Sequence, residues 1–244
     1  DSFCSSILGR KILGMRRDAK YLIFDFDDAS KMVVHLRMTG NLLYIDGSSK
    51  INIKSEENGL PRHTRVIFTL NDGSLLCFCD QRKFGRLWLY SSDEDYKDCG
   101  IDRLGPEPLT ADFSKEYLCK CLAKTQRQVK TVILDQSIVS GIGNIYSDEI
   151  LFKAGILPQT RACDISKTRA LFLYDAINDV ISKGIKANQS SIEAYMLGAR
   201  EQYSDLEKMN VYQKSGKKCK VCGTKIEKLT IGGRSSCFCP SCQR

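Results

Sequence analysis

The sequence contains little histidine, tryptophan or proline: two, one and five residues, respectively, in a chain of 244. Neither His35 nor His63 has a serine or cysteine partner at a spacing typical of a hydrolase triad, so hydrolysis of that type is disfavoured. The chain also lacks an apolar run long enough to cross a membrane, a signal peptide, an internal repeat and a low-complexity tract. We therefore expect a soluble protein with one large core or two modest ones.

Acidic residues are also in the minority. The 37 lysines and arginines exceed the 29 aspartates and glutamates, which gives a formal net charge of +8. An excess of this size does not determine a fold, but it favours a polyanionic partner, with nucleic acid ahead of a membrane surface. Charge alone leaves the partner open, because many basic proteins bind no nucleic acid.

Cysteine, by contrast, is abundant, and four of the twelve cysteines form two CxxC pairs separated by sixteen residues. Two such pairs can place four thiolates tetrahedrally around one structural Zn²⁺. Cys237 offers a competing thiol, but only Cys239 completes a CxxC pair. The expected zinc ligands are therefore Cys219, Cys222, Cys239 and Cys242.

Between the two pairs, Lys225–Thr230 and Ser235–Phe238 predict short strands around the turn Ile231–Arg234. The result would be a zinc-bound β-hairpin with Arg234 at its tip. The hairpin could merely fasten the C-terminal segment or also contact a partner, and the spacing does not decide between these roles. The other eight cysteines are scattered, as buried free thiols are, which fits a reducing compartment such as the bacterial cytoplasm or nucleoid.

The first ninety residues predict β-strands, because β-branched and aromatic residues recur in short runs separated by turn residues such as Asn71-Asp72-Gly73. Six strands at this spacing indicate an antiparallel β-sandwich. The expected strands are Tyr21–Phe26, Met32–Met38, Asn41–Ile45, Arg65–Leu70, Ser74–Cys79 and Gly85–Tyr90.

A polar stretch that contains Leu104-Gly-Pro-Glu-Pro-Leu109 follows the strands, and beyond it the apolar period becomes helical. The chain is therefore expected to be a multidomain α+β protein. Its predicted parts are a β domain (1–93), a linker (94–109), a helical domain (110–208) and a zinc finger (209–244).

Helix starts in the second part are predicted from residues that favour N-caps. The expected caps are Thr110 or Ser114, Asn144, Ser166, and Ser190 with Glu193 as a capping box. Asp148 and Glu149 are expected near the start of the helix capped by Asn144, where the helix dipole favours acids. A short helix is expected over Val129–Asp135. The helix after Ser166 should bury one face, formed by Leu173, Ile177, Ile181 and Ile185.

The segment Val139–Tyr146 is a candidate phosphate site. Gly141 and Gly143 permit a tight turn, and the helix that begins near Asn144 offers backbone N–H groups and a positive dipole end. Lys130 on the preceding helix could add a point charge. The alternative is an ordinary glycine turn, since this short string is weak evidence by itself.

The β domain holds further candidates. Lys20 stands in a basic cluster at the start of a strand, and it is either a functional cation or an ordinary solvated lysine. Met38 and Phe84 lie at predicted turns, the second beside Arg82. Apolar side chains at turns commonly reach back into the core, but they can also insert between base pairs and stabilise a kinked duplex.

Six motifs in this order resemble the formamidopyrimidine-DNA glycosylase/endonuclease VIII family, on the formamidopyrimidine-DNA glycosylase side. The resemblance extends from about Leu8 to Arg244. The motifs are Arg16-Arg17-x-Ala-Lys20, His35-Leu-Arg-Met38-Thr-Gly, Asp80-x-Arg82-Lys-Phe84-Gly, Leu104-Gly-Pro-Glu-Pro-Leu109, Gly141-Ile-Gly-Asn144 and the zinc hairpin with Gly233-Arg234.

The resemblance implies a monomeric DNA glycosylase and abasic-site lyase that removes oxidised purines, such as 8-oxoguanine and formamidopyrimidine, from double-stranded DNA. Such enzymes flip the damaged nucleotide out of the duplex. Lys20 resembles a lysine that contacts DNA at the lesion and assists catalysis. The other DNA contacts implied are three gap-filling residues (Met38, Arg82 and Phe84), His63, and four phosphate or backbone contacts (Lys130, Asn144, Tyr212 and Arg234).

The sequence departs from the family pattern at its start, which is Asp1-Ser-Phe-Cys4 in place of Pro-Glu. The family's proline amine attacks the sugar, and the α-amine of Asp1 is a poor replacement. We therefore expect the 244-residue chain by itself to be inactive as a lyase, and the favoured explanation is that it is part of a longer, active enzyme. An alternative function is a non-catalytic protein of the same fold that binds damaged DNA, and a zinc ribbon that docks to other proteins is a third.

A second departure lies between Met196 and Met209, where the family has a glycine-containing loop that covers the flipped base. This segment is more charged here and lacks the later glycine. The preferred lesion and the preferred opposite base therefore stay open.

Overall fold

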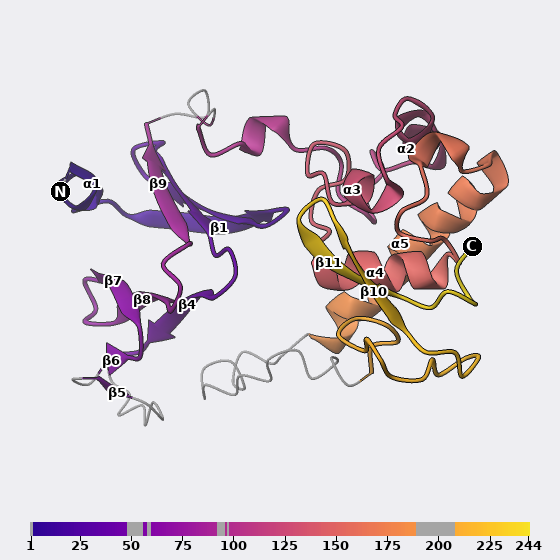
Figure 1. Ribbon diagram of the computed structural model, residues 1–244. Coiled ribbons are helices and arrows are strands. Elements are labelled where there is room, and N and C mark those ends of the chain that lie inside the picture. Colours follow the sequence, from indigo (N-terminus) through magenta and orange to yellow (C-terminus); the bar gives the residue numbers. More distant parts are fainter. Residues whose placement is uncertain (1, 48–55, 58–59, 92–95, 97, 189–207) are drawn as a thin grey trace. The chain divides into compact units, whose positions relative to one another are not determined.

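The computed structural model describes residues 2–47, 56–57, 60–91, 96, 98–188 and 208–244. They fall into two units, one up to Asp102 and one from Arg103 onward, and each is considered by itself (Figure 1). The predicted capping box at Ser190 and Glu193 lies outside the described residues, as does most of the loop between Met196 and Met209.

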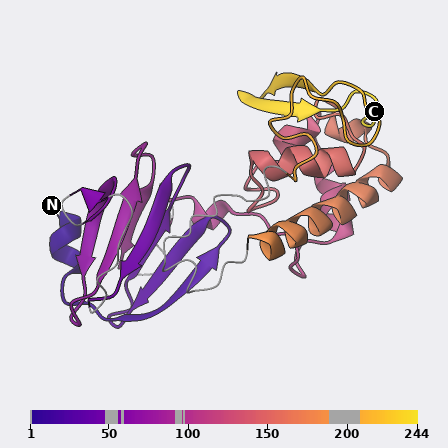
Figure 2. The same cartoon turned by 90° about the horizontal axis from the view of Figure 1, so that it is seen from below.

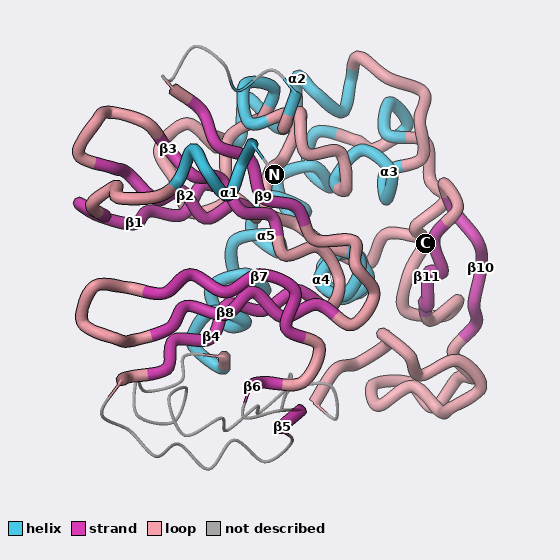
Figure 3. The backbone as a smooth tube through the Cα atoms, turned by 90° about the vertical axis from the view of Figure 1, so that its left-hand side faces the viewer, coloured by secondary structure: helices cyan, strands magenta, loops and turns pink. Residues whose placement is uncertain are grey.

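The first unit is an antiparallel β-sandwich, as predicted. One sheet has the order β1-β2-β3-β9 and the other has the order β4-β8-β7, and Figure 3 shows them as two layers. The strands are β1 (Ile12–Asp18), β2 (Tyr21–Phe26), β3 (Lys31–His35), β4 (Gly40–Ile45), β7 (Thr64–Thr69), β8 (Leu75–Asp80) and β9 (Arg86–Tyr90), with a small pair β5 (Glu56–Glu57) and β6 (Leu60–Pro61).

The core of this unit lies between the two sheets, where apolar side chains of both layers meet. Helix α1 (Ser2–Ile7) adds Phe3 and Ile7 to the same core. The buried residues are Phe24, Phe26, Met32, Val34, Leu42 and Phe78.

Two features of the sandwich differ from the sequence prediction. Strand β1 was not predicted, because this edge strand is largely exposed and its sequence shows no apolar alternation. Strand β3 ends at His35 and not at Met38, because Arg37 adopts a positive φ of 54°, which breaks the extended backbone.

The second unit is helical and carries the hairpin. The short helix η2 (Ile101–Arg103) spans the boundary between the two units. The helices of the second unit are α2 (Lys115–Ala123), α3 (Val129–Ile133), α4 (Asn144–Lys153), η3 (Ala162–Asp164) and α5 (Lys167–Ala187). Ser114 and Ser166 cap α2 and α5 as predicted, accepting hydrogen bonds from the backbone N–H groups of Tyr117 and Arg169. Most of the predicted face of α5 is covered, but Ile185 is 58% exposed near the end of the helix.

Helix α4 begins differently from the prediction. Gly143 occupies the N-cap position in an extended conformation, and Asn144 is the first helical residue, with no capping bond from its side chain. Asp148 and Glu149 do not lie in the first turn, and both are buried. They are buried because their carboxylates accept hydrogen bonds from the C-terminal finger.

The C-terminal finger carries the predicted hairpin, formed by β10 (Glu227–Ile231) and β11 (Arg234–Phe238). Its turn consists of Gly232 and Gly233, with φ values of 54° and 73°, so both positions suit glycine. Figure 2 shows α4 between α5 and this hairpin. Among the described residues, no helix is both long and apolar enough to span a membrane.

Candidate nucleic-acid interface and metal centre

Three exposed side chains of the sandwich form a group that we call the insertion cluster: Met38, Arg82 and Phe84. Met38 lies in the turn between β3 and β4, and the other two lie in the loop between β8 and β9. Arg82 Nη1 lies 3.1 Å from Met38 Sδ, and its guanidinium carbon lies 4.8 Å from the centre of the Phe84 ring. Met38 is 69% exposed and Phe84 is 51% exposed. Neither side chain therefore belongs to the core, and insertion into DNA stays a prediction.

Lys20 follows Ala19 in the two-residue turn between β1 and β2, and its side chain is half-buried. It lies close enough to His35 to act on it electrostatically. Burial lowers the pKa of His35 to about 4, with further lowering from Arg37 and Lys20. The imidazole is therefore neutral near pH 7, and its Nδ1 accepts a hydrogen bond from Arg37 N at 3.0 Å. This bond fixes the turn that leads to Met38.

The backbone of His63 is hydrogen-bonded to Asp80, which precedes the loop that carries Arg82 and Phe84. It has a positive φ of 65°, and its carbonyl oxygen accepts a hydrogen bond from Asp80 N at 3.0 Å. Its side chain is half-buried. A contact between this side chain and DNA stays a prediction.

The start of α4 has the geometry of an anion site. Gly141 adopts a φ of 86°, and its N–H donates to the side-chain oxygen of Gln136 at 3.0 Å. The chain then enters α4 at Asn144, whose Nδ2 donates to the Ser235 carbonyl at 3.0 Å. N–H groups of a first helical turn have no intrahelical acceptor and point along the axis, which suits a phosphate oxygen.

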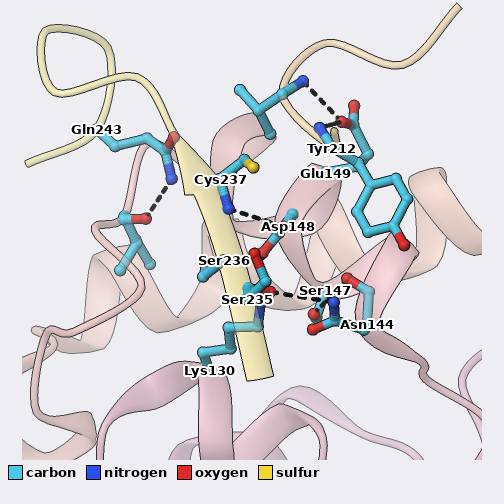
Figure 4. A network of polar contacts seen from close by, with 12 residues as sticks. Lys130, Asn144, Ser147, Asp148, Glu149, Tyr212, Ser235, Ser236, Cys237 and Gln243 are labelled. Carbon is cyan, nitrogen blue, oxygen red and sulfur yellow. Dashed lines mark hydrogen bonds and ion pairs between the residues drawn. The ribbon is translucent and has the colours of Figure 1, made fainter. Parts of the chain in front are cut away.

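Lys130 does not present a point charge to solvent, and that prediction is corrected. Its side chain is fully buried, and its Nζ donates to Asp148 Oδ1 at 2.6 Å and to the Ser235 carbonyl at 3.0 Å (Figure 4). Asp148 also accepts bonds from Ser236 Oγ at 2.8 Å and Cys237 N at 2.9 Å. The ammonium is therefore used inside the protein, where it joins α3, α4 and β11.

Glu149, the next residue of α4, holds the segment that leads into the finger. Its two carboxylate oxygens accept hydrogen bonds from Asn210 N, Asn210 Nδ2, Val211 N and Tyr212 N, at 2.8–2.9 Å. Figure 4 shows Tyr212 beside this carboxylate, with its ring directed away from the bonds that its backbone makes. The ring is half-buried, and its contact with a DNA backbone stays a prediction.

The four predicted cysteines converge on one point. The sulfur atoms of Cys219, Cys222, Cys239 and Cys242 all lie within 4.8 Å of one another. The Cys219–Cys242 and Cys222–Cys239 sulfur distances are 3.9 and 3.4 Å. A tetrahedron with Zn–S bonds of about 2.3 Å has edges of about 3.8 Å, so the four thiolates fit one structural zinc ion. Cys237 is not in this group, as predicted; it lies on β11 with its backbone N–H on Asp148.

Arg234 is exposed at the start of β11, directly after the glycine turn. The next residue, Ser235, is the one whose carbonyl accepts from both Lys130 and Asn144. Through this carbonyl the structure links the strand that begins at the exposed Arg234 to the start of α4 and to the buried Lys130. Gln243 fixes the other end of the finger, because it accepts from Cys239 N and donates to the Ile156 carbonyl, both at 2.8 Å.

Sequence reasoning gave no role to Asp80, and it assigned Asp148 and Glu149 to the helix dipole and not to the buried contacts that they make. A signal for the last two was present, since adjacent acids inside the apolar helix Asn144–Lys153 need buried partners. The signal for Asp80 was its position at the start of the motif that contains Arg82 and Phe84.

The described residues combine a β-sandwich with an exposed Met–Arg–Phe group, a helix that follows a glycine turn, and a hairpin whose cysteines fit one zinc ion. This combination defines a zinc-finger protein suited to a polyanionic partner. Three family models match the chain. They are described as the formamidopyrimidine-DNA glycosylase N-terminal domain (residues 1–87), the formamidopyrimidine-DNA glycosylase H2TH domain (104–196) and the zinc finger found in FPG and IleRS (216–244).

Curated relatives agree with these matches. The formamidopyrimidine-DNA glycosylase of Desulforamulus reducens is 40% identical over 247 residues, covering 100% of this chain and 85% of the relative. That of Pelotomaculum thermopropionicum is 38% identical over 242 residues, covering 99% and 84%.

Solved structures agree as well. Lactococcus lactis Fpg in complex with DNA containing an abasic site is 32% identical, with a TM-score of 0.83, and the match covers 100% of this chain and 86% of that one. The same values hold for its complex with DNA containing FAPY-dG. The chain belongs to the formamidopyrimidine-DNA glycosylase family of base-excision repair enzymes, which are DNA glycosylases and abasic-site lyases.

Proposed function

We propose that this chain recognises oxidised purines, such as 8-oxoguanine and formamidopyrimidine, and abasic sites in double-stranded DNA by base flipping. The observation that carries the proposal is the insertion cluster. An extruded nucleotide leaves an unstacked gap that costs a few kcal/mol. Met38 and Phe84 expose large apolar surfaces to water, and burying these surfaces in such a gap is favourable in free energy.

Arg82 is proposed to face the base left without its pair. Its guanidinium already lies against Met38 Sδ and the Phe84 ring, so the three side chains can enter the duplex together. A planar guanidinium can donate to acceptors on a base edge while its face stays on the aromatic ring.

The second unit is proposed to bind the DNA backbone. The candidates are the start of α4 with Asn144, the exposed Arg234 and the ring of Tyr212. In the first unit, Lys20 is proposed to contact DNA at the lesion and assist catalysis, and His63 is proposed to contact DNA. The net charge of +8 supports a polyanionic partner. We also propose the division of the chain into a β domain (1–93), a linker (94–109), a helical domain (110–208) and a zinc finger (209–244).

We place the protein in the bacterial cytoplasm, at the nucleoid. Its curated relatives are bacterial. None of the twelve cysteines is joined in a disulfide, which fits a reducing compartment.

The test compares two duplexes of one sequence, with and without a tetrahydrofuran abasic analogue, by fluorescence anisotropy. The full chain should prefer the damaged duplex, and Arg82→Ala should reduce the preference about tenfold, the size of one charge-assisted contact. Arg86→Ala is the matched control, since it removes the same charge from an exposed position four residues away. Equal losses on both duplexes with Arg82→Ala would reject the gap-filling role.

A further inference from the structure

Asp80 ends β8 directly beneath the insertion cluster, and it is one of the most buried charged residues of the sandwich, with 1% exposure. Its Oδ1 accepts hydrogen bonds from Thr39 Oγ1 and, at 3.2 Å, from Arg82 N. Its Oδ2 accepts from Gly85 N at 2.7 Å. One carboxylate thus joins the turn that carries Met38 to the loop that carries Arg82 and Phe84.

The carboxylate is charged in the folded protein. Burial by itself would raise the pKa of Asp80, but hydrogen bonds from Thr39, Gly85 and Arg82 outweigh burial and hold the pKa below its ordinary value. A carboxylate is well suited to this position, because it accepts several bonds at once and an amide of the same size cannot replace all of them.

The backbone around Asp80 is strained at the residues that precede the inserting side chains. Arg37 and Lys83 adopt positive φ values of 54° and 58°, which are uncommon for residues other than glycine. Arg37 precedes Met38, and Lys83 precedes Phe84. His63, also at positive φ, is tied to the same residue, because its carbonyl accepts from Asp80 N. Strained conformations persist only where surrounding contacts hold them.

Each of the two turns is also too tight for a larger residue at its glycine. A Cβ added at Gly85 would lie 2.4 Å from Phe78 Cζ and 3.1 Å from Asp80 Oδ2. A Cβ added at Gly40 would lie 2.3 Å from the Leu36 carbonyl oxygen. Both turns are therefore tight, and the Asp80 carboxylate is bonded to residues of each of them: Thr39 in one, and Arg82 and Gly85 in the other.

We propose that Asp80 is a positioning residue for lesion recognition: it holds Met38, Arg82 and Phe84 in their inserting arrangement before DNA arrives. This inference rests on the proposed gap-filling role of the cluster. Without the carboxylate, the two turns sample other conformations. The apparent affinity for a duplex with an abasic analogue then falls in proportion to the fraction of molecules that keep the inserting arrangement. Affinity for an intact duplex, which the cluster does not enter, stays the same.

The test uses the full chain with Asp80→Asn and a matched control, Asp72→Asn. Asp72 lies in the turn before β8 and accepts from Ser74 N at 2.9 Å and Ser74 Oγ at 2.5 Å, so it is also a turn-organising aspartate, at the opposite end of the strand. Affinities are measured for an abasic-analogue duplex and for an intact duplex. Asp80→Asn should reduce the preference for the damaged duplex about tenfold with unchanged affinity for the intact one, while Asp72→Asn changes neither.

A double variant separates positioning from general weakening of the fold. If Asp80 acts through the cluster, Asp80→Asn adds little further loss of preference in an Arg82→Ala background. Additive losses would overturn the inference. A wild-type preference in Asp80→Asn, with a loss in Arg82→Ala, overturns the role of Asp80 alone, whereas a wild-type preference in both rejects gap filling itself.

Thr39→Val provides the same test if Asp80→Asn does not fold. It removes the hydroxyl that donates to Asp80 and that accepts from Arg82 N at 3.1 Å, and it leaves the buried carboxylate in place. The expected loss of preference is smaller, about threefold, in the same direction. An unchanged preference would overturn the inference.

Discussion

Removing the Asp148 carboxylate is expected to have a large cost, because it leaves an unpaired cation in the interior. Lys130 is fully buried, Asp148 is 1% exposed, and the two charged atoms lie 2.6 Å apart. Asp148→Ala also removes the acceptor of Ser236 Oγ and Cys237 N. Breaking one side of a buried ion pair costs about 3–5 kcal/mol. We expect a loss of that size in the free energy of unfolding of the second unit.

Replacing both partners should cost less than replacing one. Burial lowers the pKa of Lys130 and raises the pKa of Asp148, each against the attraction of the other charge. Desolvation thus works against the charge on each group, and an apolar pair of similar volume avoids that cost. Lys130→Met with Asp148→Leu should recover roughly half of the loss; the bonds to β11 are not restored.

These effects are measured by urea unfolding of the zinc-loaded protein, with a spectroscopic signal that reports on the second unit. Asp179→Ala is the matched control, because it removes an aspartate 2.9 Å from Lys153 in an exposed pair, where the expected cost is below about 1 kcal/mol. A cost below about 1 kcal/mol for Asp148→Ala, or a double variant as unstable as the two single variants combined, would refute the reasoning.

Four further predictions concern single groups. Glu149→Gln should destabilise the docking of residues 210–212 by about 1–3 kcal/mol, seen as faster hydrogen exchange at Val211 and Tyr212, and unchanged exchange would contradict it. Cys239→Ser should abolish the binding of one zinc per chain while Cys237→Ser retains it, as measured by atomic absorption; loss of zinc in both would reject the ligand set. Arg234→Ala should weaken binding to damaged and intact duplexes alike and reduce the salt slope by about 1, and an unchanged affinity would remove the hairpin from the interface. His35 has a folded pKa of about 4, below its ordinary 6.5, so its contribution to stability is fully present above pH 6.5 and is lost as the pH falls towards 4. His35→Gln should flatten the unfolding free energy over this range, and an unchanged slope would show that His35 does not titrate there.

The parts of the fold that follow local chemistry were predictable from the sequence. The two CxxC pairs specify the zinc ligands, Ser114 and Ser166 specify two helix starts, and Gly232-Gly233 specifies the hairpin turn. Each depends on residues a few positions apart. The grouping of Met38, Arg82 and Phe84 came from the resemblance, since only a family pattern relates two turns 44 residues apart.

The parts that depend on distant partners were not predictable. Lys130 resembled a free phosphate ligand, because nothing near it in sequence shows that its acceptors are Asp148 and the Ser235 carbonyl, 105 residues away. Asp148 and Glu149 resembled dipole-stabilising acids for the same reason. Strand β1 was missed because an exposed edge strand need not alternate in polarity.

The contacts of three residues on α4 require a fixed number of residues between them. Asn144 and Asp148 lie one turn apart on one face, and Glu149 is rotated by about 100° from Asp148. Asn144 Nδ2 donates to the Ser235 carbonyl of the hairpin, and Asp148 accepts from Cys237 N of the same hairpin. Glu149 accepts from Val211 N in the segment that leads to the zinc-binding cysteines. One residue inserted between positions 144 and 148 would rotate Asp148 and Glu149 relative to Asn144, so that the contacts of all three could not form together. Changes of length in related chains are therefore expected in the flanking loops and not in this stretch.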